Sequence, residues 1–267
     1  MKRSTRSAYR RLISILQKMG GVLVAYSGGV DSTLLLYIAH RVLKDRVLAV
    51  TARSPTYPEE EISAARRFTR AHRIPHLIIS TEELKNPRFI SNPPDRCYHC
   101  KLELFTRLKE IAREEDLKVV DGSNRDDRKD YRPGLRALRR LRIRSPLDEA
   151  GFTKAMIREL AQELGLPVHN KPSLACLASR IPYHTRITPA LLERIGSLER
   201  YLRRLGLEQV RVRHHGPIAR IEVDPTQLHR AISMRNRIIR KFRAAGYKYI
   251  TIDLEGFRSG SMNLLLK

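Results

Sequence analysis

Residues 27–32 read Ser27-Gly28-Gly29-Val30-Asp31-Ser32, directly after the apolar run 22–26 and before the apolar residues 34–36. This pattern predicts a buried strand, a glycine turn and a buried helix. Glycines let backbone N–H groups approach a ligand closely, and a helix N-terminus adds unpaired donors and partial positive charge. A carboxylate such as Asp31 suits a phosphate site when Mg²⁺ bridges the two. We therefore expect an anion-binding turn rather than a glycine turn that binds nothing.

The turn lacks the lysine that stands before the closing Ser or Thr of a Walker P-loop. It resembles instead the SGGxDS loop of the PP-loop ATP pyrophosphatase superfamily. That resemblance implies cleavage of ATP between its α and β phosphates and adenylation of a carbonyl or carboxyl oxygen. The residues it assigns to ATP are those of the loop, namely Ser27, Gly28, Gly29, Val30, Asp31 and Ser32, with Mg²⁺ on Asp31.

Strand and helix patterns alternate over the first two-thirds of the chain. We predict strands at 22–26, 47–51, 76–80 and 118–121, and helices at 32–43, 58–72, 101–115 and 153–165. This order predicts an α/β fold with a doubly wound parallel sheet, and ligands of such sheets bind beyond the carboxyl ends of the strands. Gly122 and Asn124 follow one of those ends, so we expect both beside the nucleotide.

A second region follows a proline-rich passage. Its patterns predict a smaller α+β domain with a helix at 189–205, strands at 209–213 and 218–223, a turn at 214–217, a long helix at 225–245 and a strand at 248–254. We place the boundary so that residues 1–178 form the first domain, with the cysteines, and residues 179–267 the second. Arg211 and Arg213 alternate on a strand and share a face, where they could grip a phosphate or simply be solvated.

The composition is strongly basic. The 267 residues include 52 Lys and Arg against 28 Asp and Glu, a formal charge of +24. This excess suits a nucleic-acid partner, but it is spread along the chain, so nucleic acid is possible without being favoured. No apolar run is long enough to cross a membrane, and the basic N-terminus leads into an amphipathic pattern rather than a signal peptide. We expect a cytoplasmic protein without a membrane partner.

Three cysteines stand near turns or prolines. Cys97 and Cys100 form a C-x-x-C pair, and Cys176 lies in the passage 171–180. Their chemistry stays open at this point: a 4Fe–4S cluster with one open iron, a redox disulfide, scattered thiols, or a structural zinc. The odd number of cysteines favours the cluster, whereas zinc would need a fourth ligand from His99, His169 or His184.

Taken together, these segments resemble the LarE family, the ATP-dependent sulfur transferases that build the nickel-pincer nucleotide cofactor of lactate racemase. The resemblance covers almost the whole chain, and its cysteine and C-terminal segments are the most specific. The matching segments are 27–32, 97–101, 122–124, 130–136, 144–147, 175–183 and 255–263.

The resemblance implies a two-stage reaction on pyridinium-3,5-biscarboxylic acid mononucleotide. ATP adenylates a carboxylate, and a sulfur donor such as sulfide then displaces AMP to leave a thiocarboxylate. It further implies a phosphate-binding role for Arg211 and Arg213, and a homo-oligomer built from trimers. Lys101, beside Cys100, suits a positive charge for the phosphates or the adenylate, or is a surface lysine at a helix start.

Family members of one type sacrifice the sulfur of a single cysteine, which matches Cys176. Members of the other type hold a 4Fe–4S cluster with three cysteines. Because this chain has Cys97, Cys100 and Cys176, we expect the cluster type. The nearest rival is a PP-loop iron–sulfur enzyme that thiolates tRNA, although the chain shows no separate RNA-binding module.

Overall fold

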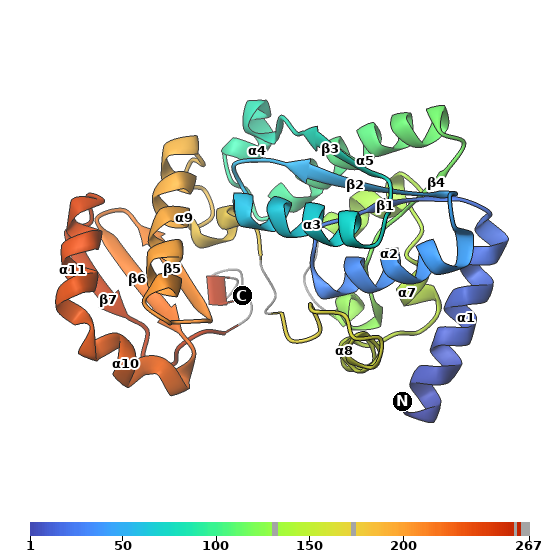
Figure 1. Ribbon diagram of the computed structural model, residues 1–267. Helices are drawn as coiled ribbons and strands as arrows, with labels where there is room; N and C mark the ends of the chain where they lie inside the picture. Colours follow the sequence, from blue (N-terminus) through green and yellow to red (C-terminus); the bar gives the residue numbers. More distant parts are fainter. Residues whose placement is uncertain (130–132, 172–174, 259–260, 263–267) are drawn as a thin grey trace. The chain divides into compact units, whose positions relative to one another are not determined.

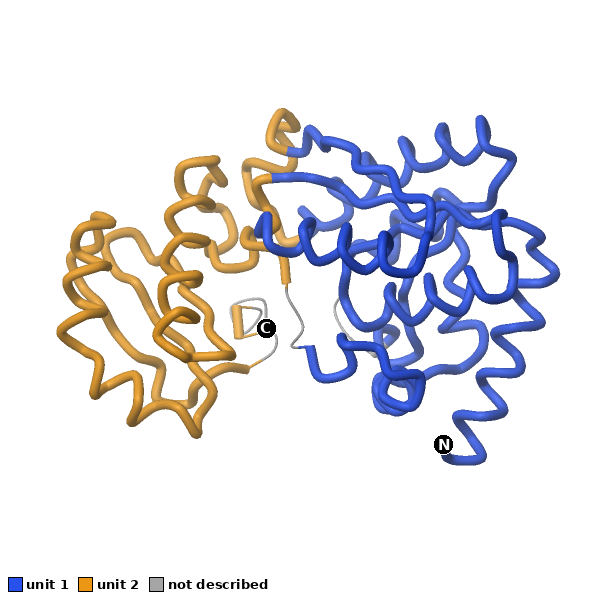
Figure 2. The backbone as a smooth tube through the Cα atoms, in the orientation of Figure 1, with its two compact units in different colours: residues 1–54, 58–83, 95–174 blue, residues 55–57, 84–94, 175–267 orange. Residues whose placement is uncertain are grey.

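The computed structural model describes residues 1–129, 133–171, 175–258 and 261–262 (Figure 1). Three segments quoted above therefore lie partly outside the described residues. The described residues leave out 130–132 in the first segment, 172–174 in the second, and 259–260 and 263 in the third. The chain forms two compact units (Figure 2). Unit 1 comprises Met1–Ser54, Pro58–Glu83 and Asp95–Leu174, and unit 2 comprises Pro55–Tyr57, Leu84–Pro94 and Ala175–Lys267.

This division differs in detail from the boundary expected at 178/179. It falls between residues 174 and 175, and it assigns two short earlier segments to unit 2. Cys97 and Cys100 consequently belong to unit 1, whereas Cys176 belongs to unit 2.

Unit 1 contains a parallel four-stranded sheet in the order β3-β2-β1-β4. The sheet confirms the predicted doubly wound α/β fold, with each strand within two residues of its expected bounds. Because β2 and β3 lie to one side of β1 and β4 to the other, the strand order reverses at β1. The carboxyl ends of β1 and β4, paired at Val24 and Val120, form the switch point at which such folds bind ligands. The strands are β1 (Val22–Ala25), β2 (Val47–Arg53), β3 (His76–Ser80) and β4 (Lys118–Val120).

Helices cover both faces of this sheet. They are α1 (Arg3–Met19), α2 (Val30–Leu43), α3 (Glu59–Ala71), α5 (Arg96–Glu114), α6 (Gly134–Arg140), α7 (Pro146–Glu149) and α8 (Lys154–Glu163), with a 3₁₀ turn η2 at Arg125–Lys129. Helix α5 begins at Arg96 rather than at the expected Lys101, because the chain enters it directly after Pro93 and Pro94. Thr153 caps α8 as expected, its Oγ1 accepting a hydrogen bond from the Met156 N–H at 3.3 Å.

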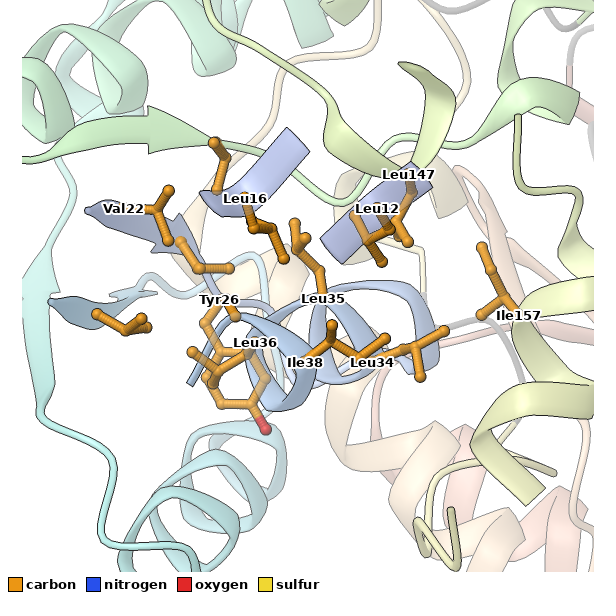
Figure 3. Close-up of a cluster of buried hydrophobic side chains, with 14 of the residues drawn as sticks. Leu12, Leu16, Val22, Tyr26, Leu34, Leu35, Leu36, Ile38, Leu147 and Ile157 are labelled. Atoms are coloured by element: carbon orange, nitrogen blue, oxygen red, sulfur yellow. The ribbon is translucent and has the colours of Figure 1, made fainter. Parts of the chain in front are cut away.

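Successive strand residues divide the core into two clusters. Val22 and Val24 of β1 pack with α1, α2, α3, α7 and α8, whereas Leu23 between them packs with α5 and α6. Figure 3 shows the first cluster, in which Leu12 and Leu16 of α1 lie near Leu35 of α2 and the end of β1. Alternation across a strand places neighbours on opposite faces, so two-sided burial explains why these strands are almost continuously apolar.

Unit 2 contains a three-stranded sheet in the order β5-β6-β7, with β5 and β6 antiparallel and β6 and β7 parallel. Helices α9 and α11 contact this sheet and each other. A 3₁₀ turn η1 (Glu83–Lys85) begins at the last residue of a unit 1 segment and continues into unit 2. The other elements of unit 2 are a short α4 (Pro87–Ile90), η3 (Leu177–Arg180), α9 (Pro189–Arg204), β5 (Val210–His215), β6 (Ile218–Val223), η4 (Pro225–Gln227), α10 (Leu228–Ser233), α11 (Arg235–Ala244) and β7 (Tyr249–Ile252).

Two sequence predictions in unit 2 are wrong. The long helix expected at 225–245 is broken into η4, α10 and α11, because Met234 has a ψ of 11° and leaves the helical path. The turn expected at 214–217 is narrower, because His214 and His215 pair with Ala219 and Ile218 as part of the β5–β6 ladder. Among the described residues, no helix is long and apolar enough to cross a membrane.

Candidate functional site

The loop 27–32 connects β1 to α2 at the switch point. Gly28 has a φ of +70°, a conformation that glycine adopts without cost. The hydroxyls of Ser27 and Ser32 lie 3.1 Å apart, and Ser32 Oγ donates to the Gly29 carbonyl at 3.2 Å. Helix α2 begins at Val30, so its first backbone N–H groups have no acceptor inside the helix. The loop thus presents donors at a helix N-terminus, the arrangement that binds phosphates.

Gly122 brings the segment after β4 against this loop. A Cβ atom at Gly122 would lie 3.0 Å from the backbone nitrogen of Ser32 and 3.1 Å from its Cα atom. Both neighbours belong to the backbone, which cannot turn aside as a flexible side chain can. A side chain at position 122 would therefore crowd the backbone of Ser32, and the structure places Gly122 against the loop 27–32.

Asp31 is held from two sides. Lys154 Nζ forms an ion pair and hydrogen bond with Asp31 Oδ2, and Asn124 Nδ2 donates to Oδ1 at 3.4 Å. Asn124 is fixed in turn, because its N–H donates to Asp127 Oδ2 at 3.0 Å and its Oδ1 accepts from the Asp126 N–H at 3.0 Å. Asn124 and Asp31 were expected together, but sequence analysis missed Lys154. Its only signal was its place as the first residue of a well-capped helix.

A second lysine supports the loop from the segment after α8. Lys171 Nζ donates to the Gly28 carbonyl at 3.0 Å and forms an ion pair with Glu61 Oε2 at 2.6 Å. The backbone of Gly28 is thereby tied to α3. Sequence analysis missed this residue too, because its partner lies more than a hundred positions away.

Lys101 reaches the end of β4. Its Nζ lies 3.6 Å from Asp121 Oδ2 and 5.7 Å from the centre of the Phe105 ring. Its stem packs so closely on Gly134 that a Cβ there would lie 2.7 Å from Lys101 Cδ. Lys101 is thus oriented toward the residue that precedes Gly122, rather than being a surface lysine without contacts.

Cys97 and Cys100 lie in the first turns of α5, not ahead of a helix as the sequence suggested. Residues three apart share a side of a helix, so the two thiols are neighbours. The Cys97 residue is exposed and Cys100 is half-buried. Between them, the Tyr98 hydroxyl accepts a hydrogen bond from Arg140 Nη1 at 2.7 Å.

Cys176 lies in unit 2 immediately before η3, and Arg180 fixes its backbone. Arg180 Nη1 donates to the carbonyl of Cys176 at 3.1 Å, while Nε and Nη2 donate to the two carboxylate oxygens of Glu199 at 2.8 and 3.1 Å. Both side chains are 1% exposed. Burial alone would raise the pKa of Glu199, but Arg180, Arg211 and Arg203 together outweigh burial and hold that pKa below its usual value. The Cys176 segment is therefore anchored to α9 through a buried ion pair.

Arg211 and Arg213 share one face of β5 as expected, but both are buried rather than solvated. Arg213 Nη2 forms an ion pair with Glu222 at 2.7 Å. The Arg211 guanidinium lies 4.9 Å from the centre of the Phe257 ring. Burial, followed by the nearby charge of Arg180, lowers the pKa of Arg211 to about 9. Positive charge is thus concentrated around Arg211.

The side chains of this region that could bind a metal are the Asp31 carboxylate and the cysteine thiols. Within the described ranges, no three His, Cys, Asp or Glu side chains gather as a metal site. A magnesium ion at Asp31 would therefore take most of its ligands from phosphates and water, which is usual for Mg²⁺. Cys97 and Cys100, three positions apart on α5, are the residues of unit 1 that would offer thiolate ligands to an iron–sulfur cluster.

Comparisons with known proteins place this geometry among sulfur-handling enzymes. Residues 16–106 match the family model described as asparagine synthase. The chain is 39% identical to the pyridinium-3,5-bisthiocarboxylic acid mononucleotide synthase of Lactiplantibacillus plantarum, over 94% of this chain and 92% of that one. It is 41% identical to a Synechocystis protein of uncharacterized function, covering 97% and 98% of the two chains. A tRNA-specific 2-thiouridylase of Clostridium perfringens is 28% identical over 56% of this chain and 52% of its own.

The contact at Gly122 predicts a specific loss of stability. Gly122→Ala should lower the free energy of unfolding by about 1–3 kcal/mol, because the added methyl forces two backbones apart. Gly29→Ala is the matched control, since its Cβ would meet only Ser27 Oγ at 3.5 Å. Urea denaturation of both variants compares them, and equal losses would show that the Gly122 contact is not a constraint.

The Arg180–Glu199 pair predicts a pH-dependent loss. Arg180→Met should cost about 3–5 kcal/mol at neutral pH, because it leaves a buried carboxylate without its main partner. A lowered pKa contributes stability that is present above the usual Glu value of 4.5 and is lost in more acid solution. The difference in free energy of unfolding between wild type and Arg180→Met should therefore become smaller as the pH falls below 4.5.

The control for this prediction is an ion pair on α9, the helix that contains Glu199. Arg200 pairs with Glu193, which is 71% exposed. Arg200→Met should therefore cost less than about 1 kcal/mol in the same urea titrations. If Arg180→Met loses no more free energy of unfolding than Arg200→Met, the buried pair does not anchor the segment.

Proposed function

Because the chain belongs to the LarE family of ATP-dependent PP-loop sulfurtransferases, we propose that it converts the carboxylates of pyridinium-3,5-biscarboxylic acid mononucleotide to thiocarboxylates. The product would serve the nickel-pincer nucleotide cofactor. The observation that carries the proposal is near-full-length similarity to a synthase of the bisthiocarboxylic acid mononucleotide. The SGGVDS loop at a switch point, supported by two lysines, gives the chain a suitable place for ATP.

The proposed chemistry has two steps for each carboxylate. A carboxylate oxygen attacks the α-phosphorus of ATP, the bond to the bridging oxygen breaks, and pyrophosphate leaves with its electron pair. A sulfur nucleophile then attacks the acyl carbon, and AMP leaves with the former carboxylate oxygen. With hydrosulfide as nucleophile, the sum is ATP, carboxylate and HS⁻ giving thiocarboxylate, AMP, pyrophosphate and H⁺. Activation is needed because an unmodified carboxylate has no leaving group.

The roles in the first step follow from the loop. Ser27, Gly28, Gly29, Val30 and Ser32 would bind the phosphates through hydroxyl and backbone donors. Asp31 would hold Mg²⁺, which supplies charge stabilisation for the leaving pyrophosphate when bound. Gly122 and Asn124 would complete the nucleotide side of the site. Lys101, held at the end of β4, would contribute positive charge to the adenylate or its phosphates.

The sulfur step is assigned to the three cysteines. We propose Cys97, Cys100 and Cys176 as ligands of a 4Fe–4S cluster. When bound, such a cluster supplies the sulfur that replaces AMP. The neighbouring thiols on α5 support this assignment, and Arg180 would position the backbone of Cys176. The sacrificial use of Cys176 as the sulfur source is the alternative.

The substrate's phosphate is assigned to Arg211 and Arg213. The lowered pKa of Arg211 reflects positive charge crowded in a buried place, and an anion bound there would offset that crowding. Arg213 pairs with Glu222 through Nη2, and its buried Nε has no hydrogen-bond partner among the described residues, so both arginines remain candidates. A trimer-based homo-oligomer and a cytoplasmic location remain part of the proposal.

Incubation with the mononucleotide tests the function directly. With ATP, Mg²⁺ and sulfide, we expect AMP, pyrophosphate and a product in which sulfur has replaced oxygen, as read by mass spectrometry. Asp31→Asn should slow AMP formation by roughly a hundredfold or more, because a charge that acts on the transition state is lost. Asp45→Asn, at an exposed position, is the control and should retain the wild-type rate.

Two results would contradict the proposal. If tRNA is thiolated in the presence of ATP while the mononucleotide is unchanged, the rival function is correct. If the mononucleotide is thiolated equally fast by the Asp31→Asn variant, the substrate is right but the assigned ATP site is wrong.

The cysteines predict a distinct outcome. Anaerobically purified protein should be brown and contain iron and sulfide. Cys97→Ala should lose iron and multiple turnover together, whereas His99→Ala on the same helix should keep both. If Cys97→Ala still completes one turnover and Cys176 loses the mass of one sulfur, the sacrificial mechanism operates. Colourless protein with tightly bound zinc would exclude the cluster.

A further inference from the structure

One segment of unit 2 concentrates positive charge without any negative charge. Residues 225–252 contain seven Lys and Arg and no Asp or Glu. All seven are exposed. Six of them lie on α11 or directly before β7, and we call these six the basic surface: Arg235, Arg237, Arg240, Lys241, Arg243 and Lys248. Figure 1 shows α11 beside β7 in the part of the chain coloured red.

Several other arginines of unit 2 have acidic partners. Arg180 and Arg203 pair with Glu199, and Arg213 pairs with Glu222. For the basic surface, by contrast, no ion pair is found within the described parts of the chain. Acidic residues of unit 2 thus pair with both buried and partly exposed arginines elsewhere in the unit, while the charge on α11 is left uncompensated.

This charge suits the helix dipole only in the last turn of α11, where Lys241 and Arg243 stand. The first turn of α11 contains no acidic residue, and Arg235 and Arg237 stand there, where the helix dipole disfavours cations. Arg237, Arg240 and Lys241 are three and four positions apart, so they share the solvent face while Ile238 and Phe242 are buried. A local pattern that works against helix stability is a mark of a functional surface.

We propose that the basic surface binds the phosphodiester backbone of a nucleic acid. Helix α11 is about 15 Å long, which spans several phosphates of a strand. A membrane surface is disfavoured because the apolar side of α11 is already buried. A protein partner is disfavoured because none of the large exposed apolar residues, Ile232 and Tyr249 included, lies on α11 to anchor one. A second copy of the chain related by a two-fold axis through this surface would meet the same charge.

The inference is independent of the proposed sulfur transfer, and so is its test. The variant Arg237→Gln, Arg240→Gln, Arg243→Gln removes three charges from the surface. Its matched control, Arg67→Gln, Arg70→Gln, Arg113→Gln, removes three exposed arginines from helices of unit 1. Both are compared with wild type by fluorescence anisotropy on short single-stranded RNA, duplex RNA and duplex DNA, and by co-sedimentation with phosphatidylserine vesicles.

Wild type should bind nucleic acid with an affinity that falls steeply between about 50 and 200 mM salt. The surface variant should bind tenfold or more weakly, with a log–log salt slope shallower by about 2–3, since each lost phosphate contact removes about 0.7–0.9. The control should stay within about twofold. The order of affinity among the three probes identifies the kind of nucleic acid.

Three results would overturn the inference: no binding to any of the nucleic acids, equal weakening in both variants, or binding to the vesicles alone. Sulfur transfer to the mononucleotide should be the same in both variants and wild type. A failure of the surface is therefore distinguishable from a failure of the proposed function.

Discussion

The backbone contact between Gly122 and Ser32 is the constraint on which unit 1 depends. It joins the segments that follow β1 and β4, the two strands at which the sheet order reverses. Without a side chain at Gly122, the start of α2 and the loop after β4 share one small volume. Asp31 and Asn124 lie on these two segments and contact each other, Asn124 Nδ2 donating to Asp31 Oδ1 at 3.4 Å. The strand order places a switch point between β1 and β4, and the absence of a Cβ atom at Gly122 leaves room there for the two segments to approach.

The second constraint is electrostatic. A Walker loop has its own lysine, but this loop has an aspartate near the corresponding place. Lys154 and Lys171, both distant in sequence, reach back to Asp31 and to the Gly28 carbonyl. The loop therefore combines its own carboxylate, suited to a metal ion, with cations from the region of α8. The carboxylate can attract a divalent cation, and the two lysines can attract the anion that accompanies it, at the same loop.

Sequence patterns were sufficient for the sheet, because two-sided burial leaves strands that are apolar throughout. They also identified the 27–32 loop, Gly122 and Asn124, since these follow strand ends. They failed for Lys154 and Lys171, because one lysine among 52 basic residues carries no local signal. They failed at Met234 as well, since Ala231, Ile238 and Phe242 keep helical spacing on both sides of the break. For Arg211 and Arg213, alternation gave the shared face but could not show that the face is covered.

Charge in unit 2 is sorted by burial. The buried arginines around Cys176 and β5 are matched by Glu199 and Glu222, because an unpaired charge in the interior is costly. At Arg211, burial and then the charge of Arg180 lower the pKa to about 9, although Glu199 acts in the opposite direction. An interior that retains excess positive charge favours a small anion, whereas the exposed charge of α11 favours an extended one. The two positive regions of unit 2 therefore differ in burial, and with it in the kind of anion that each favours.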